Sequence, residues 1–385
     1  MKIIIAGTAF PMRGGIAQYN SLMYKYFSEA DDVKVYSFKR QYPEFLFPGK
    51  TQFEQGEPAV KIPDDKNVIS IDSINPFNWL SAGKKIASEN PDLLIFKYWI
   101  PYFGPCFAVI SYIVKKFSGT DTKVLYICDN VIPHEKRFGD KFFTKLAFSQ
   151  GDYFVVMSKT VEDDLKLFSK GKPYKLIPHP VYNIFGDKVE KTEAKDFIKK
   201  EYDIDLQNEK VILFFGYIRK YKGLNYLIDA MPEILKKVKL KLLVVGEYYG
   251  DEEKYREQIR TLGLEEDIKV VSDFVPDSNV KYFFSASDVV VLPYSDATQS
   301  GIIQIAYHYD KPVIATDVGG LAEVVRNNET GLIIEPKNPG AIAKAIIEFY
   351  ENGLEEKFTI NAKEEKKKYS WEMFVESVKE LINKK

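Results

Sequence analysis

The chain has 385 residues, which is more than one ordinary domain holds and predicts two domains of comparable size. Hydrophobic residues make up 45% of the chain, a proportion typical of globular proteins with large cores. The 54 Lys and Arg residues nearly balance the 55 Asp and Glu residues, and this formal net charge of -1 excludes a general electrostatic attraction to nucleic acid.

Cysteine and histidine usage argues against a metal centre or a disulfide framework. Cys106 and Cys128 both lie in apolar segments, so we expect them to be small core residues in a reducing compartment. The first residues, MKIIIAG, lack the long apolar region of an export signal, and no run of about 18 apolar residues indicates a membrane span. We therefore expect a cytoplasmic protein and leave open a peripheral contact at the inner membrane face.

The first half of the chain alternates short apolar strands with helices, which is the pattern of a parallel sheet covered on both faces. We expect strands at residues 2–6, 33–38, 92–96, 123–128 and 153–157, and helices after Gly15 and at residues 79–88, 106–117, 142–149 and 161–168. The aromatic, proline-rich segment at residues 40–66 is too long for a plain connection and predicts a functional loop.

Gly14 and Gly15 open the first helix. Their loop does not match the G-x-G-x-x-G fingerprint, yet paired glycines at a helix start let a ligand approach the backbone closely. A tight turn that serves only packing is the alternative.

The segment from Tyr98 to Phe117 is rich in aromatic and aliphatic residues. Pro101 and Pro105 are expected to break its first part, ahead of the helix at 106–117. Two interpretations remain open, namely a helix packed on the sheet or a patch whose rim, the loop Trp99–Gly104, touches lipid.

Polar residues follow the strand at 123–128. Asp129, Asn130, His134 and Glu135 stand beyond the carboxyl end of this parallel strand, where α/β proteins place their chemistry. His134 is a candidate general base or hydrogen-bonding anchor, and an ordinary loop residue is the alternative.

A charged linker near residue 182 separates the two halves, after which the strand–helix alternation restarts. We expect strands at residues 211–215, 240–245, 268–271, 289–293, 312–316 and 330–334, and helices at 223–235, 254–262, 277–286 and 341–350. The last helix carries an apolar stripe that includes Trp371 and Phe374 and needs a partner surface. These patterns predict an N-terminal domain at 1–182, a C-terminal domain at 183–368, and a helix at 369–385 that docks back on the first domain.

The turn after the strand at 289–293 is a candidate anion site. Thr298, Gln299, Ser300 and Gly301 place backbone N–H groups and hydroxyls at a helix N-terminus, which favours a diphosphate. A serine-capped helix with nothing bound is the alternative.

The turn after the strand at 211–215, GYIRKYKG, supplies two cations, Arg219 and Lys222. A cation pair beside a helix N-terminus is what a diphosphate leaving group requires. Solvated surface charges are the alternative.

Three stretches of the second half, GYIRKYKGLNYLIDAM, DVVVLPYSDATQSGIIQIAYHYDKPVIATDVGGLAEVV and TGLIIEPKNPGAIAKAI, resemble the C-terminal domain of retaining, GT-B-fold glycosyltransferases of family four. The resemblance extends over nearly the whole chain, including the loop at Gly14 and the final helix. It implies an α/β protein of GT-B architecture, with two doubly wound parallel-sheet, Rossmann-like domains facing across a cleft. It also implies a nucleotide-diphosphate sugar donor and a reaction without metal or cofactor, because the cations take the place of a metal.

The same resemblance assigns roles to particular residues. Arg219 and Lys222 would hold the donor diphosphate, Gly15 would border the reaction centre, and the nucleotide base would lie against the loop that ends at Pro276. The expected site residues are Arg219, Lys222, His134 and Asp129 for catalysis, Gly15, Gly216, Glu247, Phe274, Pro276, Thr298, Gln299, Ser300 and Gly301 for the donor, and Gly14, Asn130 and Glu135 for the acceptor side.

This sequence departs from the family pattern at three places. Ala297 and Ile305 stand where many members carry the two glutamates of an E-x(7)-E motif. Tyr217 replaces the arginine that usually follows Gly216, and Asp129 stands where an N-terminal histidine is frequent. The contacts to the nucleotide and the sugar therefore cannot be copied from the family.

Three functions remain open. The first is a retaining glycosyltransferase that moves a sugar to a hydroxyl of a carbohydrate or lipid-linked acceptor, in polysaccharide or glycolipid synthesis. The second is a nucleotide-sugar epimerase or phosphorylase on the same fold. The third is a non-catalytic subunit that binds a sugar nucleotide, which the two missing glutamates motivate.

Overall fold

Short parallel strands organise the chain, because apolar runs such as Leu93–Phe96 and Val289–Leu292 are buried on both faces of their sheets. The computed structural model describes residues 1–43, 51–54, 56–133, 137–250, 252–273 and 275–383. The chain divides into two compact units with one such sheet each: unit 1 is Met1–Pro180 with Ser370–Lys385, and unit 2 is Val181–Tyr369.

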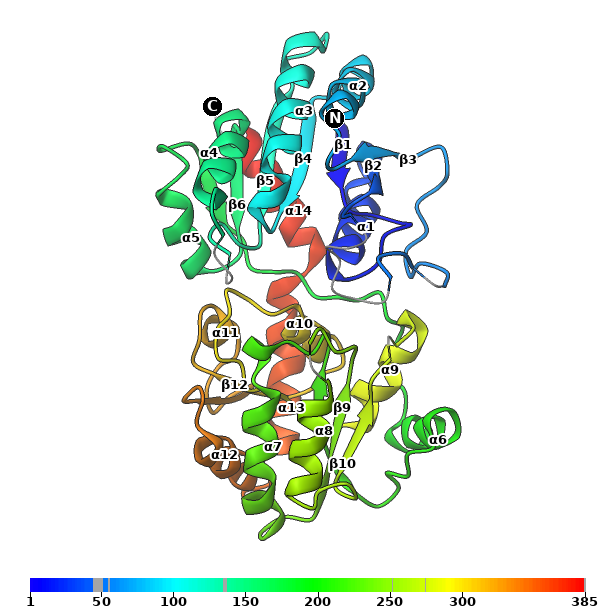
Figure 1. Ribbon diagram of the computed structural model, residues 1–385, viewed down its shortest axis with the longest axis vertical. Helices are drawn as coiled ribbons and strands as arrows, with labels where there is room; N and C mark the ends of the chain where they lie inside the picture. Colours follow the sequence, from blue (N-terminus) through cyan, green and yellow to red (C-terminus); the bar gives the residue numbers. More distant parts are fainter. Residues whose placement is uncertain (44–50, 55, 134–136, 251, 274, 384–385) are drawn as a thin grey trace. The chain divides into compact units, whose positions relative to one another are not determined.

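In its described residues, unit 1 contains a parallel sheet of seven strands in the order β3-β2-β1-β4-β5-β6-β7 (Figure 1). The strands are β1 (Lys2–Gly7), β2 (Asp32–Arg40), β3 (Asn67–Asp72), β4 (Leu93–Tyr98), β5 (Lys123–Cys128), β6 (Tyr153–Val156) and β7 (Tyr174–Leu176). The helices are α1 (Gly15–Phe27), α2 (Pro76–Ser88), α3 (Gly104–Phe117), α4 (Asp140–Gln150), α5 (Lys159–Lys166) and α14 (Trp371–Asn383), with a 3-10 turn η2 at Pro101–Phe103. Helices α2, α3 and α4 pack side by side in this order.

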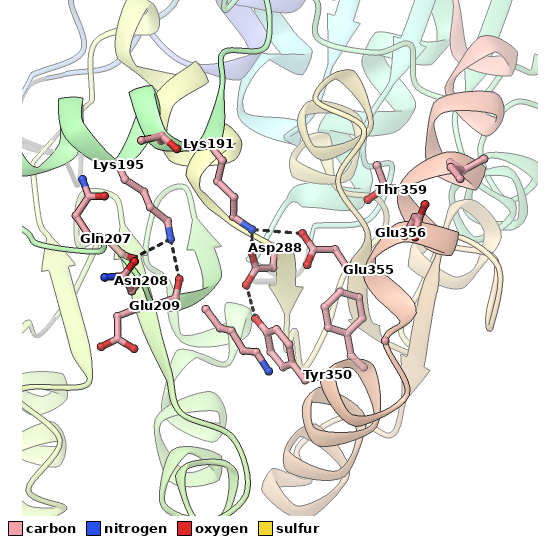
Figure 2. Close-up of a pocket in the computed structure, with 15 residues that line it drawn as sticks. Lys191, Lys195, Gln207, Asn208, Glu209, Asp288, Tyr350, Glu355, Glu356 and Thr359 are labelled. Atoms are coloured by element: carbon pink, nitrogen blue, oxygen red, sulfur yellow. Dashed lines mark hydrogen bonds and ion pairs between the residues drawn. The ribbon is translucent and has the colours of Figure 1, made fainter.

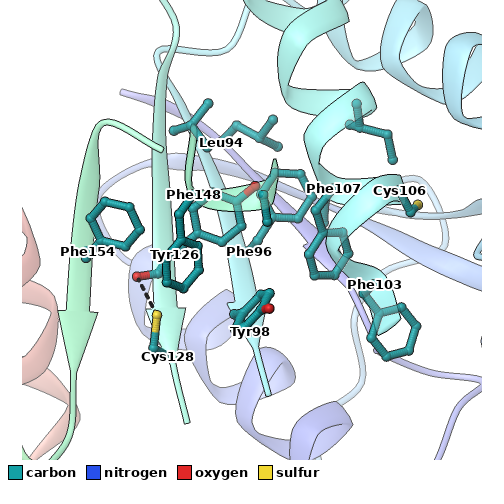
Figure 3. Close-up of a cluster of buried hydrophobic side chains, with 14 of the residues drawn as sticks. Leu94, Phe96, Tyr98, Phe103, Cys106, Phe107, Tyr126, Cys128, Phe148 and Phe154 are labelled. Atoms are coloured by element: carbon teal, nitrogen blue, oxygen red, sulfur yellow. Dashed lines mark hydrogen bonds between the residues drawn. The ribbon is translucent and has the colours of Figure 1, made fainter. Parts of the chain in front are cut away.

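Alternate residues of each strand serve the two faces of this sheet, as the two-residue period of a strand requires. Phe96 of β4 packs on Phe107 of α3, and Tyr126 of β5 packs on Phe148 of α4, within one aromatic core (Figure 3). Lys97, the next residue after Phe96 on β4, faces α1 instead, where its ammonium lies over the ring of Tyr19. Helices α2–α4 therefore cover one face and α1 covers the other.

Both cysteines are buried, as the sequence predicted. Cys106 belongs to α3 and Cys128 ends β5, and burial raises the pKa of both thiols. They are part of the core shown in Figure 3.

The segment from Tyr98 to Phe117 packs into the core. Phe103 is fully buried, and Trp99 and Tyr102 lie against the same cluster. The expected helix break at Pro105 was wrong, because α3 begins at Gly104 and places Pro105 in its first turn, where a missing N–H costs no hydrogen bond.

Helix α14 packs in unit 1 against α1. The ring of Trp371 meets Tyr19 edge-on at 4.9 Å and stacks on Tyr26 at 5.6 Å between ring centroids. Ion pairs join Lys379 to Asp31 and Lys175 to Glu380. The apolar stripe of this helix is thereby covered.

The described residues of unit 2 contain a parallel sheet of six strands in the order β10-β9-β8-β11-β12-β13. The strands are β8 (Lys210–Phe215), β9 (Leu240–Val245), β10 (Ile268–Val271), β11 (Val289–Leu292), β12 (Val313–Thr316) and β13 (Gly331–Ile334). The helices are α6 (Lys191–Tyr202), α7 (Leu224–Leu235), α8 (Glu252–Thr261), α9 (Asp277–Ala286), α10 (Gly301–His308), α11 (Leu321–Val324), α12 (Pro339–Glu351) and α13 (Leu354–Glu365), with 3-10 turns η3 at Lys220–Lys222 and η4 at Lys366–Tyr369.

Two strands, β3 and β7, were not expected from the sequence. Both are edge strands, and neither carries the continuous apolar run of a central parallel strand.

In the part of the chain that the structure describes, no helix combines the length and the apolar composition that crossing a bilayer needs.

Candidate functional site

The sheet of unit 2 reverses its winding between β8 and β11, since the strands before and after this point run outward in opposite directions. Open α/β sheets bind their ligands at such a switch point, beyond the carboxyl ends of the strands. The turns that follow β8 and β11 are joined there, because the backbone N–H of Ser295 donates to the carbonyl of Tyr221 over 2.7 Å. These two turns form the candidate functional site.

Gly223 permits this close packing of the two turns. It has φ of 68°, and a Cβ at this position would lie 1.9 Å from the carbonyl oxygen of Pro293. Any side chain at residue 223 would therefore separate the turns.

Lys222 is the central cation of the site. Only 8% of the residue is exposed, and a Cβ on Gly216 would lie 3.0 Å from its Nζ and 3.2 Å from Cδ1 of Ile302, in the first turn of α10. No carboxylate or carbonyl oxygen of the described residues accepts a hydrogen bond from this Nζ. The centroid of the Tyr294 ring lies 5.6 Å from it. Burial, helped by the charge of Arg219, lowers the pKa of Lys222 to about 7.

Arg219 lies beside Lys222 at the start of the same turn. Its guanidinium is 4.9 Å from the centroid of the Tyr249 ring, and Tyr249 in turn contacts Tyr217. Arg219 is half-buried and forms no ion pair within the described residues. The two cations thus have no counter-anion among the described residues, which makes this turn a candidate anion site.

The four residues before and at the start of α10 take the form of a capped helix. The hydroxyl of Ser300, the N-cap residue, accepts a hydrogen bond from the backbone N–H of Ile302. Gly301 begins the helix, and Thr298 is buried behind it with its carbonyl bonded to the backbone N–H of Gly320. Ser300 thus caps α10, and the side chain of Ile302 in its first turn lies with Lys222 beside Gly216, at the end of the helix whose dipole favours an anion.

Glu247 and Pro276 follow the neighbouring strands β9 and β10. Glu247 is buried, and its carbonyl accepts a hydrogen bond from Ile218 over 2.9 Å, which ties β9 to the turn that carries Arg219. Pro276 is the N-cap residue of α9. Phe274 lies outside the described residues.

Ala297 and Ile305 are both buried, with 4% and 5% exposure. Neither position can supply a carboxylate to a sugar or ribose hydroxyl. The site of unit 2 is therefore more cationic than the family pattern would make it.

Unit 1 has a second cluster of charge at its own switch point, between β1 and β4. Asp129, directly after β5, forms an ion pair of 2.7 Å with Lys97 of β4, which is 1% exposed. Burial lowers the pKa of Lys97, while the carboxylate of Asp129 opposes this effect. Asp129 is thus paired with a buried lysine at the carboxyl edge of the sheet.

An aromatic shell closes around this ion pair. Nζ of Lys97 lies 3.4 Å from the centroid of the Tyr19 ring, and His179 meets Tyr19 edge-on at 5.1 Å. Burial and the charge of Lys97 lower the pKa of His179 to about 3, so His179 is neutral at pH 7.

The other expected residues of unit 1 lie around the same edge. Gly14, with φ of 97°, is the N-cap of α1, and Gly15 is its first residue. The amide nitrogen of Asn130 contacts the carbonyl oxygen of Trp99 at 3.4 Å. His134 and Glu135 lie outside the described residues.

Sequence reasoning missed Lys97 and His179. Lys97 directly follows the apolar run Leu93–Phe96, and a lysine at that place is indistinguishable from one that points to solvent. The usable signal was Asp129, which follows the carboxyl end of the neighbouring strand. Because neighbouring parallel strands end at the same edge of a sheet, Lys97 and Asp129 could be expected to lie close together.

A cavity of about 860 Å³ lies at the opposite edge of the unit 2 sheet, near the amino ends of β8 and β11 (Figure 2). Several of its charged side chains contact one another. Lys191 contacts Asp288 and Glu355, and Asp288 also accepts from the hydroxyl of Tyr350 over 2.9 Å (Figure 2). None of the expected site residues lines this cavity, and we interpret it as a structural network.

A comparison with known protein families finds one match in the second half of the chain. Residues 184–365 match the family model described as glycosyl transferases group 1. The matched segment contains both turns of the candidate site. The match covers nearly all of unit 2, which is just under half of the chain.

Curated relatives point the same way. An uncharacterised glycosyltransferase of Methanocaldococcus jannaschii is 36% identical over 180 residues, which cover 46% of this chain and 44% of that protein. The N-acetyl-alpha-D-glucosaminyl L-malate synthase of Bacillus anthracis is 25% identical over 73% of this chain and 72% of the relative. The match to the first of these relatives thus spans less than half of its length.

Solved structures extend the fold to the whole chain. Sucrose-phosphate synthase of Thermosynechococcus elongatus superposes with a TM-score of 0.74 at 19% identity, over 99% of this chain and 98% of that one. HepE of Anabaena, solved with UDP, gives 0.75 at 17% identity, over 99% of both chains. The predicted resemblance to group 1 glycosyltransferases and the α/β fold of GT-B architecture are confirmed.

Proposed function

We propose that the protein is a retaining glycosyltransferase that moves a sugar from a nucleotide-diphosphate sugar to a hydroxyl acceptor. The observation that carries the proposal is Lys222, a buried ammonium without a carboxylate partner among the described residues, at the switch point of a glycosyl transferases group 1 unit. A buried charge without a partner is costly, so proteins keep one where a ligand completes it.

In this proposal, Lys222 and Arg219 bind the diphosphate of the donor together with the N-terminus of α10. Gly216 leaves room beside Nζ of Lys222, since a side chain there would crowd the ammonium. As the bond between the sugar and the diphosphate breaks, negative charge grows on the departing oxygen. Fixed cations next to that oxygen lower the barrier, by roughly 10²–10³-fold in rate for each such donor. Residue-based charge stabilisation of this kind makes a divalent metal unnecessary.

Retention follows if the acceptor attacks on the face from which the diphosphate leaves. The bond from the anomeric carbon to the phosphate oxygen breaks, the bond to the acceptor oxygen forms on the same face, and the acceptor proton passes to the departing diphosphate. No protein nucleophile is needed. Asp129, paired with Lys97, is our candidate for orienting sugar or acceptor hydroxyls on the side of unit 1.

UDP-sugars are the first donors to test, because the HepE structures contain UDP and UDP-glucose. The acceptor would be a carbohydrate or a lipid-linked hydroxyl, in polysaccharide or glycolipid synthesis. Release of nucleoside diphosphate from a panel of UDP-, GDP- and ADP-sugars, measured with and without candidate acceptors, tests the reaction class. Release that needs an acceptor supports transfer, whereas conversion of the donor alone would support an epimerase.

A non-catalytic subunit that binds sugar nucleotides is the second candidate, and the apolar residues at 297 and 305 favour it. Thermal shift separates the two, because a ligand that binds only the folded state raises its stability. Stabilisation by a nucleoside diphosphate without turnover of any donor would support the binding subunit. Loss of that stabilisation in Lys222→Met would still place the nucleotide at the proposed site.

A further inference from the structure

The outer surface of helices α2, α3 and α4 carries an excess of positive charge. We call this surface, with the two residues that precede the N-cap of α4, the α2–α4 face. It carries six exposed cations, which are Lys84, Lys85, Lys116, Arg137, Lys141 and Lys145. Within the described residues, none of these side chains forms an ion pair with a carboxylate, and Asp140 is the sole acidic residue on the three helices.

Two other charged helices of the chain, α5 and α8, pair their bases with acidic residues. On α8, Arg256 pairs with Glu252 and Arg260 with Glu253. On α5, Lys159 and Lys166 share Glu162. The α2–α4 face thus has a local excess of positive charge in a chain whose formal net charge is -1.

Large apolar side chains are interspersed with these cations. Phe77 on α2 is 84% exposed, Phe142 on α4 is 64% exposed, and Phe138 just ahead of α4 is fully exposed. On α3, Tyr112 and Phe117 are each about half exposed, while the opposite side of the helix is buried in the core. Nζ of Lys116 lies 5.7 Å from the Tyr112 ring and 5.5 Å from the Phe117 ring.

The three helices lie side by side over the sheet, so their outward residues share one surface (Figure 1). Exposed aromatic rings leave apolar surface in contact with water, which is unfavourable. At a bilayer surface the same rings enter the boundary between headgroups and acyl chains, and the lysines beside them meet anionic headgroups.

We propose that the α2–α4 face docks the protein on a membrane surface rich in anionic lipid. The charge complementarity commits the assignment to an anionic bilayer, because six cations faced by a single carboxylate would repel a second copy of the same face. The exposed phenylalanines favour a bilayer over a nucleic acid, because the lysines stand among apolar rings that can enter the boundary between headgroups and acyl chains. The contact does not involve the loop Trp99–Gly104, which packs into the core.

The proposal is independent of the donor site. Co-sedimentation of the full chain with vesicles of phosphatidylcholine alone, or of phosphatidylcholine with phosphatidylglycerol, tests it directly. We expect binding to the anionic vesicles that weakens with added salt, and at least about tenfold weaker partition to the neutral ones, because each base near an anionic surface contributes about 1 kcal/mol.

Two variants test the assignment to this face. Lys141→Glu with Lys145→Glu reverses two charges and should lower the partition by roughly 100-fold or more. Phe77→Ser with Phe142→Ser removes two rings and should lower it by about tenfold. All four residues are exposed, so we expect both variants to fold, and the circular dichroism spectrum of each checks this.

Matched controls come from unit 2. Lys236→Glu with Lys237→Glu reverses two exposed lysines elsewhere, and Ile360→Ser removes an exposed apolar side chain. Both should sediment like the parent protein. Equal loss in the controls, equal binding to neutral vesicles, or no binding at all would overturn the proposal. So would binding to duplex DNA that competes with the vesicles, or a dimer that disappears in the phenylalanine variant, because these outcomes assign the face to another partner.

Discussion

Each unit has a buried lysine beside the switch point of its sheet. Lys97 lies at the switch point of the unit 1 sheet, and Lys222 follows the central strand at the switch point of the unit 2 sheet. Lys97 has a carboxylate 2.7 Å away in Asp129, whereas Lys222 has Arg219 as its charged neighbour and no carboxylate among the described residues.

The difference separates a structural charge from a charge kept for a ligand. Desolvation penalises both ammonium groups, and a paired partner offsets that penalty within the folded protein. No carboxylate among the described residues offers Lys222 this offset, so we expect a bound anion to supply it. Both units thus place a buried lysine near a switch point, and the partner decides what each lysine does.

Lys97→Met should give the largest effect on stability. It leaves the Asp129 carboxylate buried without its cation, which costs about 3–5 kcal/mol. All three tryptophans of the chain, Trp79, Trp99 and Trp371, belong to unit 1, so tryptophan fluorescence in urea reports unfolding of this unit.

The double variant Lys97→Met with Asp129→Leu is the matched control. Replacing a buried ion pair by apolar residues is often neutral, so we expect it to recover most of the loss. A single variant as stable as the parent would mean that Asp129 reaches solvent, and the contrast with Lys222 would fail.

Lys222→Met should behave in the opposite way. Donor turnover is expected to fall by about 10²–10³-fold, because a cation beside the departing diphosphate is lost. Folding stability at pH 7 should stay the same or rise, because no buried partner is left behind. Steady-state release of nucleoside diphosphate and differential scanning calorimetry measure the two quantities. Stability reduced in parallel with activity would instead make Lys222 a structural residue like Lys97.

The sequence predicted much of the frame behind this comparison. Apolar runs such as residues 92–96 and 289–293 gave the central strands, because burial on both faces leaves a continuous signal. The edge strands β3 and β7 escaped, since a half-exposed edge has no such run. The boundary expected after residue 182 lies two residues from the end of the first segment of unit 1.

The site was less predictable than the fold. Arg219 and Lys222 were picked out by their place in a turn, yet their surroundings stayed open, because burial depends on the packing of Gly216 and Ile302 around Lys222. Lys97 was missed altogether, since its partner comes from a different strand. Pairing across strands is a property of tertiary structure, which residue patterns along one strand do not contain.

The pH dependence of stability sharpens the comparison at Lys222. Its folded pKa of about 7 lies below the unfolded value of about 10.4, so between these values the unfolded chain holds a proton that the folded chain has released. Stability contributed by this group therefore rises with pH in that window, by about 1 kcal/mol per pH unit. The free energy of unfolding of the parent protein, relative to that of Lys222→Met, should therefore increase by roughly 2 kcal/mol between about pH 7.5 and about pH 9, as measured by calorimetry. Parallel curves for the two proteins would show that Lys222 stays protonated, as a lysine with a hidden anionic partner would.

The smallest expected effect concerns the aromatic ring beside each lysine. Nζ of Lys97 is 3.4 Å from the centroid of the Tyr19 ring, and Nζ of Lys222 is 5.6 Å from that of Tyr294. A double-mutant cycle with Lys→Met and Tyr→Leu should give a coupling of about 1 kcal/mol for the first pair and less than about 0.5 kcal/mol for the second. Urea unfolding measures the first cycle through the tryptophans of unit 1, and calorimetry measures the second. Equal couplings would mean that Tyr294 stabilises the ammonium of Lys222 as strongly as Tyr19 stabilises that of Lys97. Lys222 would then need an external anion less than its burial implies.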